Sequence, residues 1–303
     1  MNICIVGASG FLSNKIVEYS LNKTFAVSVL GRKNQYTDGD IKFFAIDLLE
    51  NDIPIEICAV ADVIIYAAAL GVQSSLTISG NDIFSVNAFI PISLVESLKQ
   101  KSYKGKLITF GSYFEIGNAD NAFEQYNEEE IVFAKGKLPN EYCLSKRLLT
   151  RYFFDTDCPF TYYHCILPTI YGKGEKANRL IPYLINSIID QTDIKLSYGM
   201  QIRQYLLADD AVSIMFNMIN ENAMGGIYNF PSAETMNVRE IAEIVHQSFQ
   251  TSLNTKIFGK EERKDQLMRS LKLNFDKLAR TINIGALTTL NKYIKFTNNT
   301  RWN

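Results

Sequence analysis

Short apolar segments alternate with longer amphipathic segments through the first half of the chain. Apolar runs of strand length lie at 2–6, 25–30, 42–46, 62–67, 106–111 and 161–167, and helical periodicity covers 10–22, 83–101 and 139–155. Several strand segments, such as 63–66, are apolar at every position, as expected where both faces of a sheet are covered. Strands that alternate with helices predict a doubly wound parallel α/β sheet with right-handed crossovers.

The pattern changes after residue 167. The loops lengthen around Gly172 and Gly174, and helical periodicity returns near 177–190, 209–220, 237–248 and 285–295. We therefore predict a first domain over 1–167, which segments at about 205–230 rejoin. A smaller, mixed α/β lobe is predicted over 168–303.

Composition and charge exclude several classes of function. Of the 303 residues, 47% are hydrophobic and 21% are charged, which is ordinary for a globular protein. Lys and Arg number 31 against 32 for Asp and Glu, so no basic excess indicates nucleic-acid binding.

The longest apolar stretch, 63–70, is far shorter than the ~20 residues that cross a bilayer. The N-terminus shows no basic stretch followed by an apolar signal core, so we expect a cytoplasmic protein without a membrane partner.

Cysteine and histidine usage argues against a metal site. The five cysteines lack CxxC spacing, and the two histidines, His164 and His246, have no ligand partners at metal spacing. We expect free thiols, no metal, and His164 inside a core strand.

The first predicted strand runs directly into the turn Gly7-Ala8-Ser9-Gly10-Phe11-Leu12, and a helix follows. Glycine at position 7 allows a tight turn, and glycine at position 10 allows a pyrophosphate to approach the backbone. The N-terminus of the helix offers free N–H groups and a favourable dipole to an anion. In this position the motif indicates a dinucleotide site, and a plain strand-to-helix turn is the alternative.

The turn at 7–12 resembles that of the extended short-chain dehydrogenase/reductase family, NAD(P)-dependent enzymes that act mainly on nucleotide sugars. Ser13 replaces the family's third glycine and is small enough for close helix packing. Further signatures follow in the family's order over nearly the whole chain: Asp47-Leu48, Ala67-Ala68-Ala69, Asn87, Ser112, Tyr142 with Lys146, Pro168 to Gly172, Arg203 and Tyr228-Asn229. The resemblance implies a Rossmann-like domain that binds the dinucleotide over 1–167 and a substrate lobe over 168–303.

Tyr142 and Lys146 lie one helical turn apart and match the family's YxxxK motif, with Ser112 as the third catalytic residue. The same spacing recurs at Tyr19 and Lys23, so spacing alone carries little weight, and a surface helix is the alternative. A tyrosine pKa of ~10 must fall by roughly three units, or about 4 kcal/mol, to match neutral pH. A cation at ~4 Å in an effective dielectric of ~20 supplies about that much, so we expect Lys146 to lower the pKa of Tyr142. In a reductase Tyr142 protonates the developing alkoxide, and Ser112 hydrogen-bonds the same oxygen.

The end of the second strand bears on the choice of cofactor. An NAD enzyme usually places Asp or Glu here for the ribose hydroxyls. This chain has Arg32 and Lys33, and no acid before Asp38. The planar guanidinium of Arg32 suits a 2′-phosphate, although a solvated basic turn is an alternative. We predict NADP, with NAD as the alternative.

The resemblance implies further cofactor contacts. Asp47, beside Leu48, corresponds to the acid that contacts adenine, although capping of a helix is an alternative role. The small strand end Ala67-Ala68-Ala69 and Pro168 line the cofactor's path, and Lys146 binds the nicotinamide ribose. Asn87 organises the site through backbone contacts.

The resemblance also implies substrate contacts and a homodimer. The substrate contacts are Ser112, Tyr113, Tyr171, Asn178 and Arg203, the last for the diphosphate of the nucleotide. Family members often dimerise through the helix predicted at 83–101, in which Pro91 predicts a kink or a broken hydrogen bond.

The residues after Ser112 bear on the reaction. Family members that remove water from a sugar place Asp and Glu here, whereas Tyr113 and Phe114 cannot transfer those protons. Reduction of a 4-keto sugar and 4-epimerisation remain, and Arg32 favours reduction because NADPH is the usual cellular reductant. A non-catalytic NADP-binding regulator is disfavoured, because the three catalytic residues are all present.

The C-terminal lobe, with Arg203 and the segment 258–273, resembles bacterial reductases of nucleotide-activated 4-keto-6-deoxyhexoses. These enzymes, of the CDP-abequose, CDP-paratose and dTDP-fucose synthase type, serve surface polysaccharide synthesis. The resemblance implies a CDP-, dTDP- or UDP-linked substrate.

Overall fold

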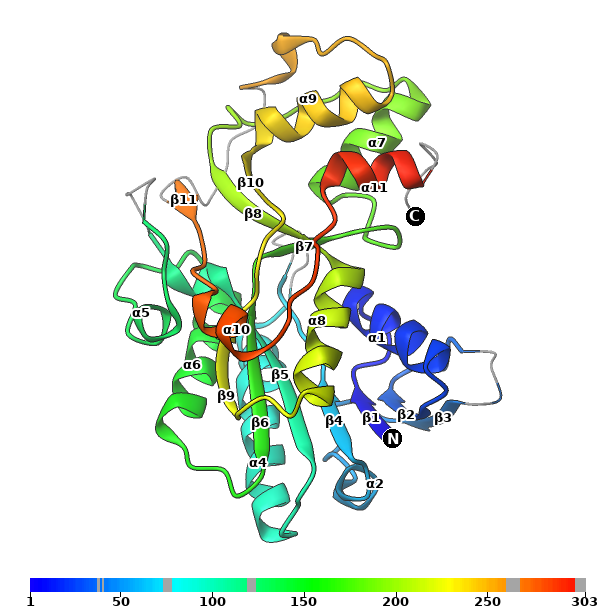
Figure 1. The fold of residues 1–303 in the computed structure, drawn as a ribbon, viewed down its shortest axis with the longest axis vertical. Coiled ribbons are helices and arrows are strands. Elements are labelled where there is room, and N and C mark those ends of the chain that lie inside the picture. The colour runs from blue at the N-terminus through cyan, green and yellow to red at the C-terminus, as the bar shows by residue number, and fades with distance from the viewer. Residues whose placement is uncertain (37–38, 40, 73–77, 119–123, 260–267, 298–303) are drawn as a thin grey trace.

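The computed structural model describes residues 1–36, 39, 41–72, 78–118, 124–259 and 268–297 (Figure 1). Its larger layer is a seven-stranded sheet with the order β3-β2-β1-β4-β5-β6-β9, in which all neighbouring strands are parallel. The strands are β1 (Asn2–Val6), β2 (Ala26–Gly31), β3 (Ile41–Ala45), β4 (Val63–Tyr66), β5 (Lys106–Ser112), β6 (Thr161–Leu167) and β9 (Gly226–Asn229). This is the order of a doubly wound dinucleotide-binding sheet with one added strand, and the predicted fold class is confirmed.

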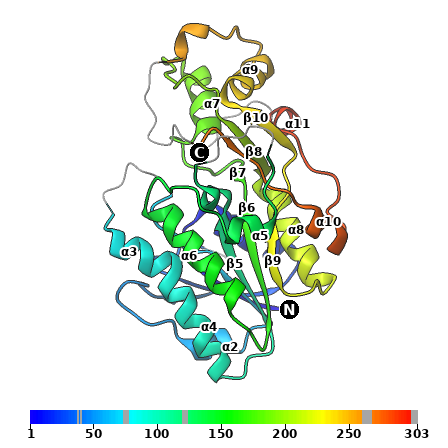
Figure 2. The same cartoon turned by 90° about the vertical axis from the view of Figure 1, so that its left-hand side faces the viewer.

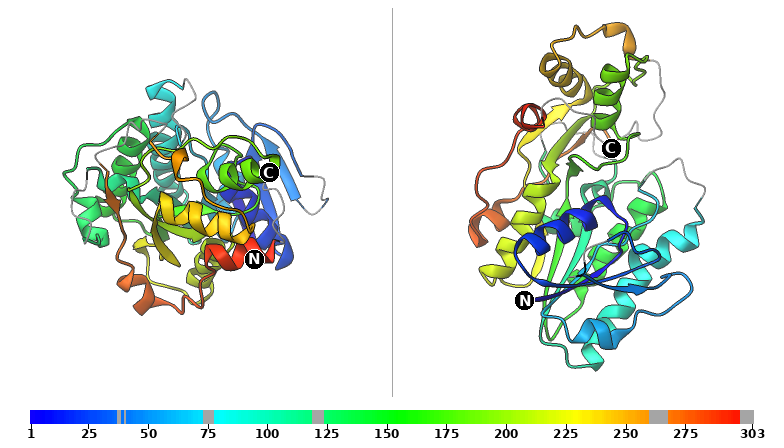
Figure 3. Two further views of the ribbon diagram at one scale, coloured as in Figure 1. Left: turned by 90° about the horizontal axis from the view of Figure 1, so that it is seen from above. Right: turned by 90° about the vertical axis from the view of Figure 1, so that its right-hand side faces the viewer.

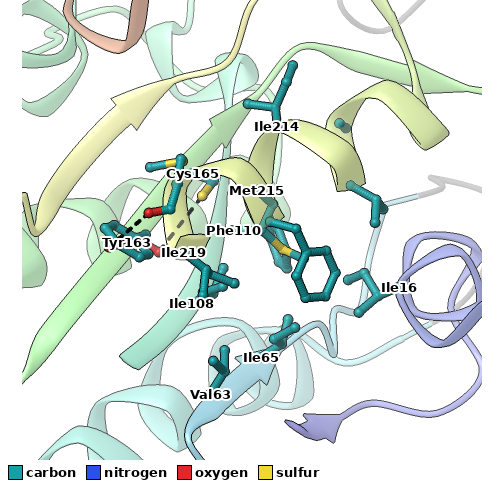
Figure 4. Close-up of a cluster of buried hydrophobic side chains, with 14 of the residues drawn as sticks. Ile16, Val63, Ile65, Ile108, Phe110, Tyr163, Cys165, Ile214, Met215 and Ile219 are labelled. Atoms are coloured by element: carbon teal, nitrogen blue, oxygen red, sulfur yellow. Dashed lines mark hydrogen bonds between the residues drawn. The ribbon is translucent and has the colours of Figure 1, made fainter. Parts of the chain in front are cut away.

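Helices cover both faces of this sheet. On one face lie α1 (Phe11–Asn22) and α8 (Ala208–Asn220), and on the other α4 (Ile90–Gln100) and α6 (Glu141–Asp155) (Figures 2 and 3). Alternate residues of β1 enter the two cores, Ile5 on the α1 face and Cys4 on the opposite face. Figure 4 shows Met215 and Ile219 of α8 packed with Ile108 of β5 in the core on the α1 face.

The helix predicted at 83–101 is interrupted. The structure has α3 (Gly80–Phe84), a π-helical turn η1 (Ser85–Phe89) and then α4, whose second residue is Pro91. Proline lacks an N–H, so the Val86 carbonyl, five residues earlier, has no backbone donor from this position. The Tyr66 hydroxyl donates to that carbonyl instead, at 2.7 Å. The predicted break at Pro91 thus takes the form of a π-helical turn.

A second, smaller sheet forms the upper lobe in Figure 1. Its strands are β7 (Thr169–Tyr171), β8 (Ile202–Leu207), β10 (Glu234–Asn237) and β11 (Ser270–Leu271), and only β10 runs antiparallel to β8. Helices α7 (Leu180–Asp190), α9 (Val238–Ser248) and α11 (Leu290–Phe296) enclose a third core with it. The chain then returns from β8 through α8 to β9 of the large sheet.

The shorter elements connect these layers. They are α2 (Ile55–Ala59), α5 (Glu128–Val132), α10 (Asp276–Thr281) and the 3-10 turns η2 (Tyr113–Ile116) and η3 (Thr255–Ile257). The helix predicted at 285–295 begins only at Leu290, because Gly285 adopts a positive φ of 76° and Thr289 caps the helix. Helix α10 was not predicted.

Candidate active site

The glycine turn brings the carboxyl ends of β1 and β4 together. Gly7 has a φ of +108°, and a Cβ on it would lie 2.6 Å from the backbone nitrogen of Ala68. Any side chain at position 7 therefore forces apart the two strand ends over which the cofactor is expected to run.

The turn fits a phosphate group. Gly10 is the N-cap of α1, its position has no side-chain cap, and the first helical turn carries no acidic residue. The N–H groups of that turn are therefore available to an anion, and the helix dipole favours one. Ser13, in place of the third glycine, is buried with its Oγ 3.1 Å from the point that a Cβ on Gly10 would occupy. Beyond the turn, Phe11 lies 3.4 Å from the Cβ position of Gly172 in the loop after β7, while Ser9 is exposed.

The segment after β2 is tied to the glycine turn, which the sequence did not reveal. Gln35 Nε2 and Tyr36 Oη both donate to the Ala8 carbonyl, at 2.6 and 2.8 Å. Arg32 is exposed at the start of this segment. Asp38, the next acid along the chain, lies outside the described residues. Selection of a 2′-phosphate by Arg32 stays a prediction.

Asp47 and Asn87 have different surroundings. Asp47 Oδ1 accepts the Leu49 N–H at 3.1 Å within a turn, and α2 begins only at Ile55, so Asp47 does not cap a helix. Asn87 is fully buried in the π-helical turn. Its side-chain amide bonds the N–H and the carbonyl of Leu70 and also the Ser145 hydroxyl. It therefore joins the segment after β4 to α6.

Ser112, Tyr142 and Lys146 come together from β5 and α6. Ser112 ends β5. Asn140 caps α6 by accepting the Cys143 N–H at 3.0 Å, which places Tyr142 and Lys146 in the first two turns of the helix. Ser112 and Tyr142 share a side-chain hydrogen bond. Lys146 is 5% exposed, and its Nζ donates to the Phe110 carbonyl at 2.8 Å. The fold thus places the three side chains at the carboxyl end of β5, where doubly wound sheets bind their ligands.

The predicted net fall of the Tyr142 pKa is not found. Burial raises the pKa of Tyr142 above its ordinary value, while the hydrogen bond with Ser112 and the cation of Arg179 oppose the rise. Burial is the dominant influence on Tyr142 and also lowers the pKa of Lys146 to about 8, so the stabilisation of a tyrosinate by Lys146 stays a prediction. Tyr142 is consequently a protonated phenol at neutral pH, which is the form that donates a proton.

An acid that sequence reasoning missed lies behind this group. Glu115 of η2 is fully buried, and burial raises its pKa to about 7. Its Oε1 accepts the Ser112 N–H at 2.6 Å, while Ser112 Oγ accepts the Phe114 N–H at 3.3 Å. The Ser-x-x-Glu spacing at 112–115 is the sequence signature of such a capping box and was the available signal.

Two of the predicted substrate residues are placed in the core. Tyr113 and Tyr171 are both fully buried, and their hydroxyls bond Thr169 Oγ1 at 2.5 Å and the Thr288 carbonyl at 3.1 Å. Neither hydroxyl is open to a substrate, because these hydrogen bonds satisfy groups that lie among apolar side chains. In this structure both hydroxyls thus have structural partners, and the substrate contacts predicted for Tyr113 and Tyr171 stay predictions.

The other predicted residues lie on β8, just before α7 and between β6 and β7. Arg203 is 4% exposed and donates to the Ile202 and Met268 carbonyls, each at 2.7 Å, with its guanidinium 5.9 Å from the centre of the Phe114 ring. Asn178 is exposed just before α7, and Pro168 is buried between β6 and β7. Of the segment 258–273, residues 260–267 lie outside the described residues.

Neither a metal cluster nor a membrane span is present in the described ranges. No group of three or more His, Cys, Asp or Glu is arranged there to hold a metal ion. None of the helices found there is long and apolar enough to cross a bilayer.

Comparison with known proteins agrees with this architecture. A model of the family described as "NAD dependent epimerase/dehydratase family" matches residues 3–230. The CDP-abequose synthase of Salmonella muenchen is 26% identical over 106 residues, which are 34% of this chain and 36% of that enzyme. The UDP-N-acetyl-alpha-D-glucosaminuronate decarboxylase of Bacillus cytotoxicus is 25% identical over 268 residues, covering 80% of this chain and 78% of that enzyme.

A solved structure shares the fold over nearly the whole chain. The UDP-glucose 4-epimerase of Thermus thermophilus, crystallised with NAD, superimposes with a TM-score of 0.78. The match covers 98% of this chain and 97% of that one, at 18% sequence identity.

Proposed function

Since the chain belongs to the NAD-dependent epimerase/dehydratase family, we propose that it is an NADP-dependent reductase of a nucleotide-linked 4-keto-6-deoxyhexose. The observation that carries the proposal is the protonated Tyr142, which meets Ser112 at the carboxyl end of β5, in a sheet whose first strand ends in a glycine turn that fits a dinucleotide. The partial match to a CDP-abequose synthase supports a sugar nucleotide as substrate and a role in surface polysaccharide synthesis.

In this mechanism the chain's own residues handle the proton. A bound nicotinamide dinucleotide supplies the hydride. Tyr142 Oη donates its proton to the carbonyl oxygen of the substrate, which becomes a hydroxyl. Ser112 Oγ accepts the Phe114 N–H, and in the proposed complex its own hydrogen turns from Tyr142 to the same substrate oxygen. Lys146, charged below its pKa of about 8, stabilises the tyrosinate until a solvent proton replaces the one given up.

The cofactor is proposed to lie across the carboxyl ends of the central strands. The N–H groups at the start of α1 and the Gly7-to-Leu12 turn would hold its pyrophosphate. Asp47 with Leu48 would hold the adenine, and the strand end at Ala67–Ala69 would border the nicotinamide half. Arg32, which is exposed after β2, is proposed to bind the 2′-phosphate of NADP.

A 4-epimerase is the second candidate. The observation in its favour is the likeness over nearly the whole chain to a UDP-glucose 4-epimerase that was crystallised with NAD. An epimerase uses the same Ser, Tyr and Lys but regenerates its cofactor within each turnover, whereas a reductase consumes NADPH.

Product analysis separates the two reactions. The protein is incubated with UDP-, dTDP- and CDP-linked hexoses and their 4-keto-6-deoxy derivatives, with and without NADPH. We expect a product two hydrogens heavier than a keto substrate, formed one-for-one with NADPH oxidation. An isomer of unchanged mass, formed without net use of cofactor, would establish epimerisation instead.

A homodimer is proposed to form through α6 and the π-helical turn. Leu144 and Leu148 lie one turn apart on α6 and are 48% and 38% exposed. Phe89 of η1, against which α6 packs, is 53% exposed. These three residues, called the α6 patch below, present apolar side chains to solvent, as protein–protein interfaces do.

A further inference from the structure

A chain of buried polar side chains runs from η2 through α6 to the centre of the large sheet. Thr150 Oγ1 donates to Glu115 Oε2 and lies 2.8 Å from His164 Nε2. On the other side of the imidazole ring, His164 Nδ1 lies 2.8 Å from Thr109 Oγ1. All four side chains are at most 1% exposed. None of these four side chains takes part in the proposed proton transfer.

The fold fixes this chain directly behind the catalytic residues. Tyr142, Lys146 and Thr150 are spaced by four and therefore share one face of α6. Thr109 and His164 are register partners on β5 and β6. The space between these elements exists because residue 111 is glycine. A Cβ there would lie 2.8 Å from Glu115 Oε1 and 2.8 Å from His164 Nε2.

Glu115 is the carboxylate that acts on Lys146. Its negative charge raises the pKa of Lys146 against the effect of burial, and Lys146 in turn lowers the pKa of Glu115. His164 does not add a competing cation, because burial and Lys146 lower its pKa to about 3. The imidazole is therefore neutral and donates or accepts hydrogen bonds according to its tautomer.

The other titratable groups around Glu115 and Lys146 do not replace this carboxylate. On α6, Tyr142 is neutral at neutral pH, and the Arg147 guanidinium donates to the backbone carbonyls of Glu115, Ile116 and Gly136. Arg179 of α7 faces Tyr142 and forms an ion pair with Glu175 at 2.9 Å. Glu128, Glu129 and Glu130 of α5 are at least partly exposed.

We propose that Glu115 is a positioning residue of the active site: its buried carboxylate fixes the turn that presents Ser112 and serves as the counter-charge that keeps Lys146 a cation. Thr150 and His164 support the carboxylate through hydrogen bonds. Glu115 touches neither the substrate nor the cofactor, since both of its oxygens are engaged by Ser112 N–H and Thr150. The catalytic consequence of this inference rests on the proposed function, because it concerns the same Tyr142 and Lys146.

Glu115→Gln removes the negative charge but keeps the shape of the side chain. The amide oxygen still accepts the Ser112 N–H, and the side-chain volume is nearly unchanged. Without the anion, nothing offsets the effect of burial on Lys146 in the way that Glu115 does, so the pKa of Lys146 must fall. An opposite charge within ~4–6 Å typically shifts a pKa by about one unit or more.

The decisive measurement needs no substrate. Lysine labelled with ¹³C at Cε is incorporated into the full chain, and the NMR signal of Lys146 is assigned by its loss in Lys146→Met. We expect a titration midpoint near pH 8 in the wild type and a midpoint lower by about one pH unit in Glu115→Gln. Glu129→Gln, which neutralises an exposed glutamate of α5, is the matched control and should leave the midpoint in place. An unchanged midpoint in folded Glu115→Gln would overturn the proposal.

A second variant covers the case in which Glu115→Gln does not fold. Thr150→Val keeps the side-chain shape but removes the hydrogen bond to Glu115. The carboxylate then holds its proton to higher pH, and its negative charge raises the pKa of Lys146 less. The Lys146 midpoint should again fall, by a smaller amount, and a midpoint equal to that of the wild type would then count against the proposal.

Activity gives an independent readout once a substrate is known. In Glu115→Gln the alkaline limb of the kcat/KM profile should move to lower pH by the same amount as the NMR midpoint. A purely structural role would lower the rate at every pH without moving the limb. If the NMR midpoint moves but no sugar nucleotide is reduced, the proposed function fails while the charge coupling between Glu115 and Lys146 stands.

Discussion

Tyr142 is poised to give up a proton rather than to take one. Burial keeps its phenol protonated, while the hydrogen bond with Ser112 and the positive charge of Arg179 stabilise the tyrosinate that forms after the proton has left. These opposing influences suit a general acid, which must hold its proton in the resting enzyme and release it to a developing alkoxide.

Removing the Tyr142 hydroxyl should separate chemistry from binding. In Tyr142→Phe we expect turnover to fall by at least ~10²-fold, because general acid catalysis contributes about that much. Cofactor binding, measured by fluorescence titration, should stay near the wild-type value because the phosphate-binding turn is untouched. Retention of full activity would remove Tyr142 from the mechanism.

Arg32 offers a test of cofactor selection at a single side chain. Arg32→Ala should weaken NADPH by roughly 10- to 150-fold, since a charge-assisted hydrogen bond contributes about 1.5–3 kcal/mol. NADH lacks the 2′-phosphate and should bind almost as before. The measurement is the Kd of each nucleotide for both proteins; equal losses for the two would exclude selection by Arg32. Lys33→Ala, the neighbouring exposed cation, is the control.

Glu115 also leaves a signature in stability. Its pKa is about 7 in the folded state against an ordinary value of 4.5, so between these values the folded state binds more protons than the unfolded state. The free energy of unfolding therefore falls as pH rises through this window, by about 3 kcal/mol. Glu115→Gln does not titrate and should gain about that much stability over the wild type between pH 4.5 and pH 7. Urea unfolding on both sides of the window measures the difference, and a constant difference would contradict the folded-state pKa.

At the scale of elements, the contacts between segment ends define the cofactor site. The turn after β1 approaches the end of β4 through Gly7 and Ala68, and the segment after β2 is bonded to the Ala8 carbonyl. The π-helical turn before α4 places Asn87 where it joins the end of β4 to α6. Small residues and side-chain hydrogen bonds thus hold several loops at one edge of the sheet.

Gly7→Ala should damage this arrangement. The added Cβ would lie 2.6 Å from the Ala68 nitrogen, and a φ of +108° is strained for any L-residue. We expect the melting temperature to fall and NADP(H) to lose its stabilising effect on melting. Gly39→Ala is the matched control, because nothing lies within 4 Å of its Cβ position. Equal melting behaviour of Gly7→Ala and the wild type would show that the strand ends can separate without loss.

At the scale of the whole molecule, the chain passes from the large sheet into the small lobe and back again. The link from β8 through α8 to β9 returns to the large sheet, and the ion pair of Lys15 in α1 with Asp209 in α8, at 3.1 Å, adds a surface contact between its helices. On the opposite face of the sheet the α6 patch remains exposed. A proposed partner copy therefore binds on the face away from α1 and α8.

Leu148→Glu tests that interface. A charged side chain in the α6 patch should convert a dimer into a monomer, because a desolvated, unpaired carboxylate at an apolar interface is unfavourable. Sedimentation equilibrium measures the mass, and circular dichroism verifies that the helix content is unchanged. Val60→Glu, at an exposed valine outside the patch, is the control. The same mass for Leu148→Glu and the wild type would rule out this surface.

Local pattern was sufficient for the large sheet. Every predicted strand from 2–6 to 161–167 is present, and central strands such as β4, which is apolar at each position, are buried between two layers of helices. The hydrophobic pattern failed to predict the start of α11 and the presence of short helices. Helix α11 starts later than predicted because Thr289 caps it, and the short helices α5 and α10 carry too little periodicity to be predicted.

The sequence by itself determined the fold class and the family, because both are written in periodicity and in motifs whose spacing is local: the glycine turn, the YxxxK helix and the order of strands. Only the tertiary structure decided the electrostatics of the site. Tyr142, Arg179, Glu115 and His164 are far apart along the chain, and their pKa values depend on burial and on which charges the fold brings near. Desolvation acts through three-dimensional surroundings, so residue spacing predicted a lowered Tyr142 pKa where burial raises it, and it overlooked the buried carboxylate of Glu115.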